Sequence, residues 1–440
     1  MSDKILPDPK SWLDPYGTLL QTEDSEWIYR ALTEEGVHLL EYIKDRVGLS
    51  KLHDIGIVKT EEVNDEIDND NFKAIIRHKR IHPVIYPQEW TMKMWKDALA
   101  LFCDLNIKLR KIGLKLHDAH PLNILFDNGK PVFIDFSSLR LLSSNANIPL
   151  YWHTEFKKYF ILPLLVHNLG FKKLSESVIK EPNHGTFKQY YYYTPFVLPM
   201  LLIDIVYVFG YLTKLWPIYF KTVKFLSGIN IVPPIKTQWT TYSSSTGNWK
   251  ERAVKEAISE CEPCSSIFDI GGNKGTYTYE LAKNGKQVTV ADIDEVSLEV
   301  LRKKSLANDV PLSTIKLNIC QPTPRLGLGL MKDNAFERYA SDVVIALALS
   351  HHLAFFNKLP FHAFANMVQD FSNKFIITEY VDLTDPHVIK WRRRKRKYPT
   401  PYSREYFLES FENESFTPVK EWSNENKTRY IFLFKKNESQ

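Results

Sequence analysis

The chain has 440 residues, a length that suggests two or three domains, and its composition is 44% hydrophobic, 13% aromatic and 25% charged. These fractions are close to average globular usage and exclude wholesale disorder and collagen-like structure. Lysine and arginine number 57 against 52 aspartate and glutamate residues, and a net charge of +5 is too small for an obligate nucleic-acid-binding protein. Four cysteines do not make a disulfide framework, and the first residues lack the apolar core of a secretory signal. We therefore expect a cytoplasmic protein without a nucleic-acid partner.

Residues 1–165 mix short strands with helices and are expected to form an α+β domain. The expected elements are a hairpin-like beginning at 16–30, helices at 34–47 and 91–112, an acidic loop at 61–71 and an extended run at 72–76. Two short strands follow at 124–126 and 132–134, around the turn Asp127-Asn128-Gly129. An Asn-Gly pair between two such strands is a strong hairpin signal.

Residues 166–235 are expected to be a helical, aromatic-rich connector. Its core, 196–212, is apolar except for Asp204. A spanning helix needs ~20 apolar residues, and a charge at mid-bilayer costs ~2.5–3.5 kcal/mol. A buried packing helix is therefore the favoured interpretation, with a membrane-surface or partner contact and a transmembrane helix as the alternatives.

In residues 236–440, β-rich runs alternate with amphipathic stretches, which predicts right-handed βαβ units and a parallel sheet. The expected strands are 267–270, 287–291, 314–318, 342–347 and 374–379, and the expected helices are 276–284, 295–308 and 360–372. Ser403 is the expected N-cap of a further helix through residue 411, followed by a hairpin of strands 416–422 and 429–434. The prediction is an α/β, Rossmann-like domain of seven strands, five of them parallel, with an antiparallel edge.

The first of these strands ends in a glycine-rich turn that could hold a cofactor. Gly271, Gly272, Asn273 and Gly275 lie between this strand and the next helix, where backbone amides are unpaired. Asp292, 21 residues after Gly271, ends the second strand and could accept both ribose hydroxyl protons of an adenosine-containing cofactor.

Both a nicotinamide dinucleotide and S-adenosylmethionine fit this pattern. The acid that precedes the turn, Asp269, suits the ammonium of a methionine moiety, and the expected closing hairpin also favours S-adenosylmethionine. A Rossmann-like domain with another cofactor, or with none, is the alternative.

The fourth strand leads into the pair His351-His352, and the fifth ends at Glu379. Ligands of open α/β sheets lie beyond the carboxyl ends of the strands, so the histidines should face the transferred methyl group. Imidazole is a suitable general base for an attacking hydroxyl, and Glu379 could orient a histidine or a sugar hydroxyl. Adjacent histidines point apart, so no metal is expected in this site.

These motifs resemble those of class I methyltransferases over residues 236–440, and more narrowly those of the family related to the nodulation protein NoeA. The matching stretches are 268–276, 347–353, 379–381 and 385–405. The resemblance implies S-adenosylmethionine as cofactor and O-methylation of a glycan or related small acceptor. It also implies that Asn318 and Ile319 lie near the adenine, although Asn318 replaces an acidic residue of the family pattern.

Two stretches of the C-terminal half leave alternatives open. Residues 392–397 are six consecutive cations, typical of a solvated helix end and alternatively a docking surface for phosphorylated glycan or anionic lipid. Residues 239–249 are rich in hydroxyl and aromatic groups and are expected to be either a segment that covers the cofactor or a linker.

A second constellation lies in residues 1–165. Asn123 follows Asp118 by five residues, and Asp135 comes 12 residues later, on the far strand of the hairpin. The spacing resembles that of kinases, in which such an Asp orients the acceptor hydroxyl and the Asn and second Asp hold Mg²⁺ against the phosphates of ATP. The glycine-rich loop is poor, however, and Arg30 or Lys73 would have to replace the usual strand lysine. Phosphotransfer, binding of nucleotide or metal without turnover, and a scaffold role all remain open.

The sequence therefore predicts an S-adenosylmethionine-dependent methyltransferase with an N-terminal kinase-like domain that could use ATP and Mg²⁺. One alternative is a carbohydrate or lipid kinase whose C-terminal half only binds a cofactor. Another is a non-catalytic assembly factor that uses 196–212 and the basic run to associate with the anionic inner face of a membrane.

Overall fold

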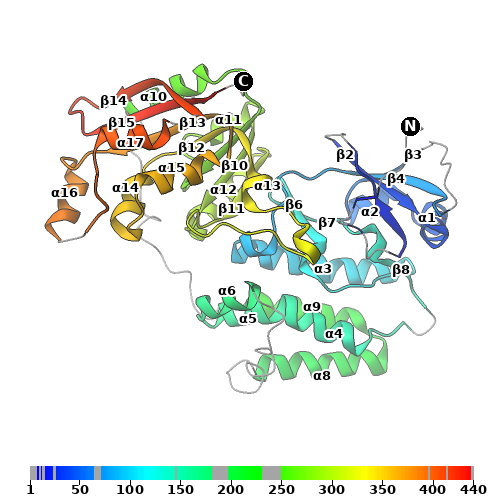
Figure 1. The fold of residues 1–440 in the computed structure, drawn as a ribbon. Coiled ribbons are helices and arrows are strands. Elements are labelled where there is room, and N and C mark those ends of the chain that lie inside the picture. The colour runs from blue at the N-terminus through cyan, green and yellow to red at the C-terminus, as the bar shows by residue number, and fades with distance from the viewer. Residues whose placement is uncertain are drawn as a thin grey trace. The chain divides into compact units, whose positions relative to one another are not determined.

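The computed structural model divides into two compact units, Met1–Pro234 and Ile235–Gln440 (Figure 1). The residues that it describes are 7–8, 11, 15–22, 26–63, 71–143, 146–180, 197–229, 249–394, 397–412 and 415–437. Expectations for 64–70, for 181–196 and 230–235 of the connector, for 239–248 and for the two basic residues 395–396 lie outside these residues.

The second unit is built on one seven-stranded sheet. Its strands are β9 (Ser266–Ile270), β10 (Gln287–Asp292), β11 (Leu312–Lys316), β12 (Ser341–Ala346), β13 (Ser372–Val381), β14 (Phe416–Ser423) and β15 (Arg429–Lys436). Their order is β11-β10-β9-β12-β13-β15-β14, in which the first five are parallel and β15 is antiparallel to both of its neighbours. The predicted sheet of five parallel strands with an antiparallel edge is confirmed.

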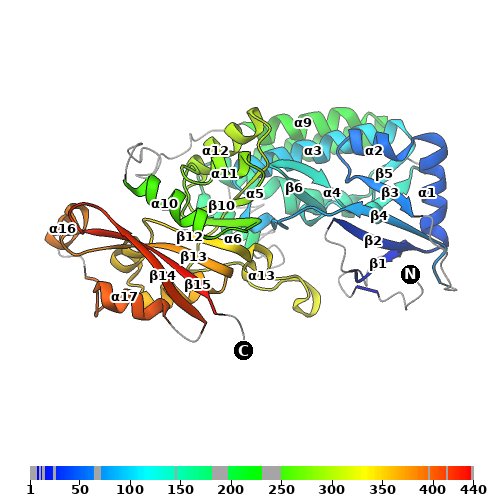
Figure 2. The same cartoon turned by 90° about the horizontal axis from the view of Figure 1, so that it is seen from above.

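Helices cover both faces of this sheet, which is why its central strands are apolar on both sides. Figure 2 shows α10, α11 and α12 on one side and α13 and α17 on the other. Alternate residues of β9 serve the two layers: Ile267 joins the core under α10–α12, whereas the Phe268 ring stacks on Tyr339 of α13 with centroids 5.5 Å apart. The helices of this unit are α10 (Trp249–Glu260), α11 (Tyr279–Lys283), α12 (Glu295–Ala307), α13 (Ala335–Tyr339), α14 (Ser350–His352), α15 (Phe361–Gln369), α16 (Pro386–Arg393) and α17 (Arg404–Phe411).

Several predicted boundaries differ from the observed ones by two or three residues, and two of these differences have a local cause. The third parallel strand begins at Leu312 rather than 314, because Asp309 adopts a φ of +51° and turns the chain directly after α12. The first helix after the glycine turn begins at Tyr279 rather than 276, because Gly275 has a φ of +65° and the turn continues through Thr278. The predicted N-cap at Ser403 is confirmed, since its side chain accepts the N–H of Tyr406.

The first unit begins with a four-stranded antiparallel sheet of order β1-β2-β4-β3. The strands are β1 (Gly17–Leu19), β2 (Trp27–Leu32), β3 (Thr60–Val63) and β4 (Ala74–Lys79), and the neighbouring helices are α1 (Glu34–Arg46), α2 (Leu49–Asp54) and α3 (Met92–Lys111). The predicted hairpin is confirmed as β6 (Ile124–Asp127) and β7 (Lys130–Phe133). Its turn residues Asn128 and Gly129 have φ values of 47° and 78°, the left-handed pair that a tight two-residue hairpin requires. A further pair, β5 (Leu114–Leu116) and β8 (Leu139–Leu141), follows α3.

The helices described between residues 150 and 228 fall within the same compact unit as the strands before them. They are α4 (Leu150–Phe156), α5 (Leu162–Asn168), α6 (Lys172–Lys180), α8 (Val197–Thr213) and α9 (Trp216–Gly228), with a π-helical turn at Lys157–Ile161. The Tyr207 hydroxyl donates to the Ile148 carbonyl at 2.8 Å, and the Asn168 amide donates to the Ser227 carbonyl at 3.0 Å. No helix among the described residues combines the length and the apolar character needed to cross a membrane.

Candidate active site

The glycine turn of the second unit is fixed by the neighbouring strand β10. The amides of Gly271 and Gly272 donate to the Ala291 carbonyl at 2.8 and 3.3 Å. A Cβ atom on Gly272 would lie 2.5 Å from Asp269 Oδ2, and a Cβ on Gly275 would lie 2.9 Å from the Leu301 side chain. Larger residues at these two positions would displace the backbone, so the glycines are required by close packing.

Asp292 lies at the tip of β10 and holds the same turn. Its Oδ2 accepts the N–H of Asn273 at 2.9 Å, and its Oδ1 accepts the N–H of Asp294 at 2.8 Å. Burial raises the pKa of this carboxyl, whereas the backbone hydrogen bonds lower it. A carboxylate has about four lone-pair sites, so acceptor capacity remains for a ligand.

Asp269 supports the turn from below. The side chain is buried, its Oδ2 accepts the Thr278 hydroxyl at 2.8 Å, and burial raises its pKa to about 7. Because the Gly272 backbone lies directly over this carboxyl, Asp269 shapes the turn rather than lining its outer side.

Asn318 and Ile319 follow β11 on the other side of Asp292. The Leu317 amide donates to the Asp292 carbonyl at 3.0 Å, which places this segment beside the tip of β10. Asn318 is exposed, and its side chain accepts the N–H of Cys320 at 3.1 Å, whereas Ile319 is buried. The predicted cofactor-binding residues thus lie together at the carboxyl ends of β9, β10 and β11.

The two histidines lie on α14, just beyond the end of β12. Their ring centroids are 4.3 Å apart, and the His351 ring stacks on Trp391 of α16 at 5.6 Å. His351 is 2% exposed, and its Nδ1 has no hydrogen-bond partner among the described residues; His352 is only partly buried. Burial lowers the pKa of His351 strongly and lowers that of His352 to about 4. Both imidazoles are therefore neutral near pH 7.

Glu379 is completely buried at the end of β13 and binds two cations. Its Oε2 lies 2.5 Å from Lys250 Nζ and accepts the N–H of Ala348 at 2.7 Å, and its Oε1 lies 3.5 Å from Arg429 Nη1. Arg429 also contacts Asp385, with Nε and Oδ2 2.8 Å apart. Ala348 has a φ of +52°, unusual for alanine, so this carboxylate holds a strained turn directly before the histidines.

Sequence reasoning missed Lys250, Arg429 and Trp391 as parts of this site. Lys250 comes 129 residues before Glu379, and Arg429 comes 50 residues after it. No motif links these positions, because only the folded sheet brings β13, β15 and α10 together. Asp385 did belong to one of the stretches that resemble the NoeA-related family, but that pattern gave it no role.

The second predicted site, in the first unit, is partly assembled around the β6–β7 hairpin. The Ile134 amide donates to the Asn123 carbonyl at 2.9 Å, so Asn123 lies beside the chain that leads to Asp135. The Asp118 amide donates to Ser138 Oγ at 3.2 Å, and burial together with the charge of Asp135 raises the pKa of the Asp118 carboxyl.

A cation from β2 joins this second site. Arg30 is buried, and its Nη2 lies 4.0 Å from Asp135 Oδ1, whereas Lys73 is exposed. Of the two candidates for the strand cation, Arg30 is therefore the one that reaches Asp135. Nowhere in the described residues do three or more His, Cys, Asp or Glu side chains form a metal-binding group.

Comparison with known proteins gives two sequence relatives, and no protein-family model matches the chain. Nodulation protein NoeA of Rhizobium meliloti (strain 1021) is 23% identical over 377 residues, which cover 78% of each protein. The ubiquinone/menaquinone biosynthesis C-methyltransferase UbiE of Zymomonas mobilis subsp. mobilis is 30% identical over 91 residues, 21% of this chain and 34% of that protein. The chain is a class I S-adenosylmethionine-dependent methyltransferase related to NoeA.

Two solved methyltransferase structures are similar to this chain at lower sequence identity. Magnesium protoporphyrin IX methyltransferase (ChlM) from Synechocystis PCC 6803 with bound SAH is 15% identical, covers 44% of this chain and 91% of its own, and has a TM-score of 0.32. The N-methyltransferase NodS from Bradyrhizobium japonicum WM9 is 12% identical. The match covers 44% of this chain and 90% of the NodS chain, with a TM-score of 0.33.

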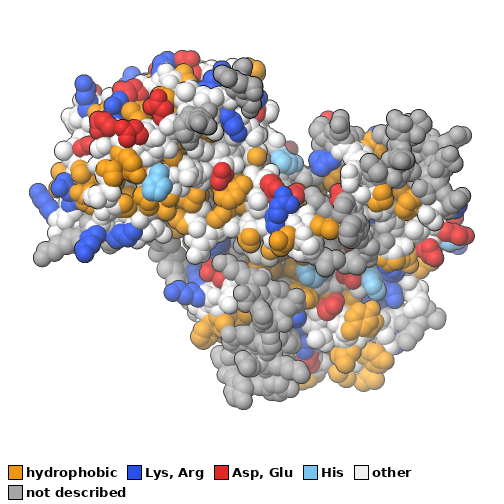
Figure 3. All heavy atoms as spheres, viewed as in Figure 1, with side chains coloured by type: hydrophobic (Ala, Val, Ile, Leu, Met, Phe, Trp, Pro, Cys, Tyr) orange, Lys and Arg blue, Asp and Glu red, His pale blue; other side chains and the backbone are white. Residues whose placement is uncertain are grey.

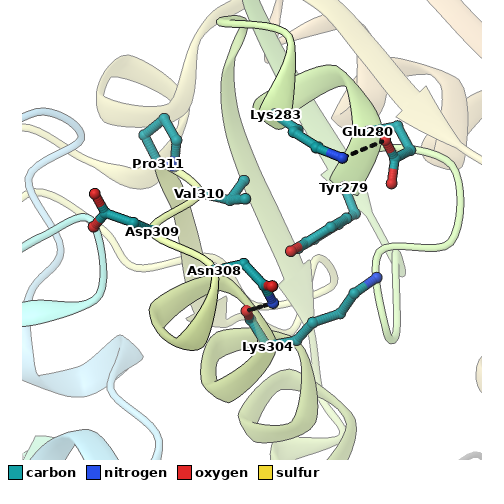
Figure 4. Close-up of a pocket in the computed structure, with 8 residues that line it drawn as sticks. All are labelled: Tyr279, Glu280, Lys283, Lys304, Asn308, Asp309, Val310 and Pro311. Carbon is teal, nitrogen blue, oxygen red and sulfur yellow. Dashed lines mark hydrogen bonds and ion pairs between the residues drawn. The ribbon is translucent and has the colours of Figure 1, made fainter.

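A surface hollow of about 460 Å³ lies beside the amino end of β11 (Figure 4). It is lined by the end of α12 and the residues that precede β11, and Lys304 Nζ lies 3.5 Å from the centroid of the Tyr279 ring. Three further lining residues, Tyr279, Glu280 and Lys283, lie on α11, and none of the predicted cofactor-binding residues lines the hollow.

The buried histidines predict a pH dependence of stability. The unfolded chain binds protons at these residues as the pH falls through 6.5, whereas native His352 does so only near 4. The contribution of the neutral histidines to stability is therefore complete above pH 6.5 and is lost between 6.5 and 4, by about 3 kcal/mol for His352 alone. Denaturant unfolding at several pH values measures this loss as a difference: between pH 6.5 and 4 the unfolding free energy of the wild type should fall relative to that of His351→Gln/His352→Gln.

Asp269, whose pKa is raised, stabilises the protein more as the pH falls. Because it is present in both proteins, its contribution cancels in the difference between their unfolding free energies. His362→Gln, at an exposed histidine of α15, is the matched control and should behave as the wild type. An equal loss of stability in the double variant and the wild type would contradict the assignment.

Proposed function

We propose that this methyltransferase transfers the methyl group to a hydroxyl oxygen of a glycan or a related small acceptor. The observation that carries the proposal is the pair of neutral imidazoles on α14, one of them partly exposed, at the carboxyl end of the strand beside the cofactor turn. A neutral ring nitrogen can accept the proton of an attacking hydroxyl.

The residues present fit S-adenosylmethionine at the edge of β9 and β10. Asp292 would accept hydrogen bonds from the ribose hydroxyls, the turn 271–275 would lie beneath the cofactor, and Asn318 and Ile319 would lie beside the adenine. The fit rests on the spare acceptor capacity of Asp292 and on a turn whose glycines leave no Cβ at its closest contacts. When bound, S-adenosylmethionine supplies a methyl group on a positively charged sulfur.

His352 is the residue that we assign to contact the acceptor, because His351 is almost completely buried. Glu379 does not reach the acceptor in this assignment; it positions Lys250, Arg429 and the strained turn at Ala348. His351 and Trp391 then orient the His352 ring by packing against it.

The electrostatics of the site leave both imidazoles able to accept a proton. Beyond burial, the charges of Arg429 and Lys250 lower the pKa values of both histidines. Glu379 and Asp385 balance these two cations, so the preference for a hydroxyl rests on the neutral imidazole that can accept its proton. The rings of Trp391 and Phe356, whose centroids are 5.1 Å apart, add apolar surface beside polar groups, which suits the mixed surface of a sugar.

The cofactor assignment predicts that Asp292→Ala loses S-adenosylmethionine binding. The variant removes two charged hydrogen bonds to the ribose and an anchor of the turn, so the affinity should fall at least ~100-fold. Isothermal titration of both proteins measures this, with Glu280→Ala, an exposed acid of α11, as the control that should bind normally. Equal affinity of Asp292→Ala and the wild type would exclude the site.

The acceptor assignment predicts a methyl group on oxygen and a dependence on His352. With oligosaccharides as acceptors, His352→Ala should slow single-turnover methyl transfer by ~10²–10⁴-fold and leave the cofactor affinity unchanged. Fragmentation mass spectrometry of the product locates the methyl group, and His362→Ala serves as the control. A methyl group on nitrogen or carbon, or full activity of His352→Ala, would refute the assignment.

A second candidate function is the binding of a nucleotide with Mg²⁺ in the first unit. It is favoured by the hairpin that brings the chain at Asn123 beside the residue before Asp135. Mg²⁺ is commonly held by one or two carboxylate ligands together with substrate phosphates, so this small donor set fits a metal–nucleotide complex. Asp118 would orient a hydroxyl, and Arg30 would supply positive charge near the phosphates.

This second function predicts that the chain binds ATP only with Mg²⁺ and that Asp135→Asn weakens binding at least ~10-fold. Titration calorimetry tests it, with the exposed Asp54→Asn as control. Absence of Mg²⁺-dependent binding in the wild type would exclude it. ATP turnover that is lost in Asp135→Asn and persists in Asp292→Ala would instead support a carbohydrate or lipid kinase.

A further inference from the structure

The helix α8 of the first unit carries one charged side chain, and this side chain faces the protein. Asp204 Oδ1 lies 2.5 Å from Lys157 Nζ and 2.7 Å from His153 Nε2. Met200, Ile203 and Tyr207 are buried on the same side of the helix. The helix is therefore held to its neighbours by one apolar strip and one ionic cluster.

The outer face of α8 is apolar and exposed. Its eight large hydrophobic side chains are between 41% and 77% exposed: Leu198, Leu201, Leu202, Ile205, Val208, Phe209, Tyr211 and Leu212. On α9 and its ends, Leu215, Ile218, Phe225 and Ile229 continue this apolar surface with exposures of 42% to 69%. Figure 3 shows hydrophobic side chains gathered over the part of α8 that is in view. Soluble monomers rarely leave so many neighbouring apolar side chains in water.

The other charges of these two helices and their link are all positive. Between residues 205 and 229 the sequence has three charged residues, Lys214, Lys221 and Lys224, and each of them is exposed. Lys214 contacts Asn147, and Lys224 pairs with the exposed Asp104. An apolar helical face with lysines at its margin is the arrangement of helices that lie in the interface of a bilayer containing anionic lipid.

We propose that the outer face of α8 and α9 docks this protein onto a membrane leaflet that contains anionic lipid. A leaflet provides acyl chains for the apolar side chains and anionic headgroups for the lysines. A second copy of the chain fits this face less well, because the same face of the other copy would offer the lysines no acid of α8 or α9 except Asp204, which is already paired. The exposed side chains are mainly Leu, Ile and Val, rather than the Trp, Tyr and Arg that dominate protein–protein contacts.

The test is flotation of the full chain with phosphatidylcholine vesicles, with and without phosphatidylglycerol. The wild type should float with the anionic vesicles and much less with the neutral ones. The variant Leu198→Ser/Ile205→Ser/Leu212→Ser should bind the anionic vesicles on the order of 100-fold more weakly. All three side chains are exposed, so an unchanged melting temperature should accompany this loss.

Val300→Ser/Val419→Ser, at two exposed apolar residues of the second unit, is the matched control and should float as the wild type. Lys221→Glu should reduce binding to the anionic vesicles and leave binding to the neutral vesicles unchanged. The proposal is overturned if the wild type does not float, or if the triple variant floats equally well. A wild-type dimer that the triple variant converts to a monomer, without vesicle binding, would show that a second copy covers the face.

Discussion

The carboxylate of Asp292 is the contact on which the candidate active site depends. One oxygen accepts the N–H of Asn273 in the glycine turn. The other accepts the N–H of Asp294, the N-cap of α12. The group proposed to hold the cofactor ribose is thus also the group that shapes the turn beneath it. The parallel register of β9 and β10, in which Asp269 lies opposite Val290, brings the turn to this carboxylate.

A second buried network fixes the acceptor side. Glu379 binds Lys250, Arg429 and the amide of Ala348, so a single carboxylate joins α10, β15 and the turn after β12. Removal of one member of a buried ion pair typically costs ~3–5 kcal/mol, because the remaining charge stays buried without compensation. The histidines are neutral beside this network, and their neutrality is the basis of the proposal that the acceptor is a hydroxyl.

Much of the second unit could be predicted from the sequence, because local patterns decided it. Strand–helix alternation predicted the seven-stranded sheet, the glycine turn and Asp292 indicated where the proposed cofactor site lies, and Ser403 marked a helix start. The exact position of Asn318 could not be predicted, since it depends on the left-handed turn at Asp309. Lys250 and Arg429 were also beyond reach, because their partnership with Glu379 exists only in the folded sheet. In the first unit, the Asn128-Gly129 pair was enough to predict the β6–β7 hairpin. The apolar composition of α8, in contrast, did not show that only one side of this helix is buried.

The central claim is that the edge of β9 and β10 holds an adenosine-containing sulfonium cofactor beside His352. A crystal structure of the full chain with S-adenosylhomocysteine tests it most directly. The account predicts the ribose hydroxyls on Asp292, the adenine beside Ile319 and the sulfur facing α14. A ligand bound anywhere else, or a turn at 271–275 that remains closed against it at saturating concentration, would contradict the account.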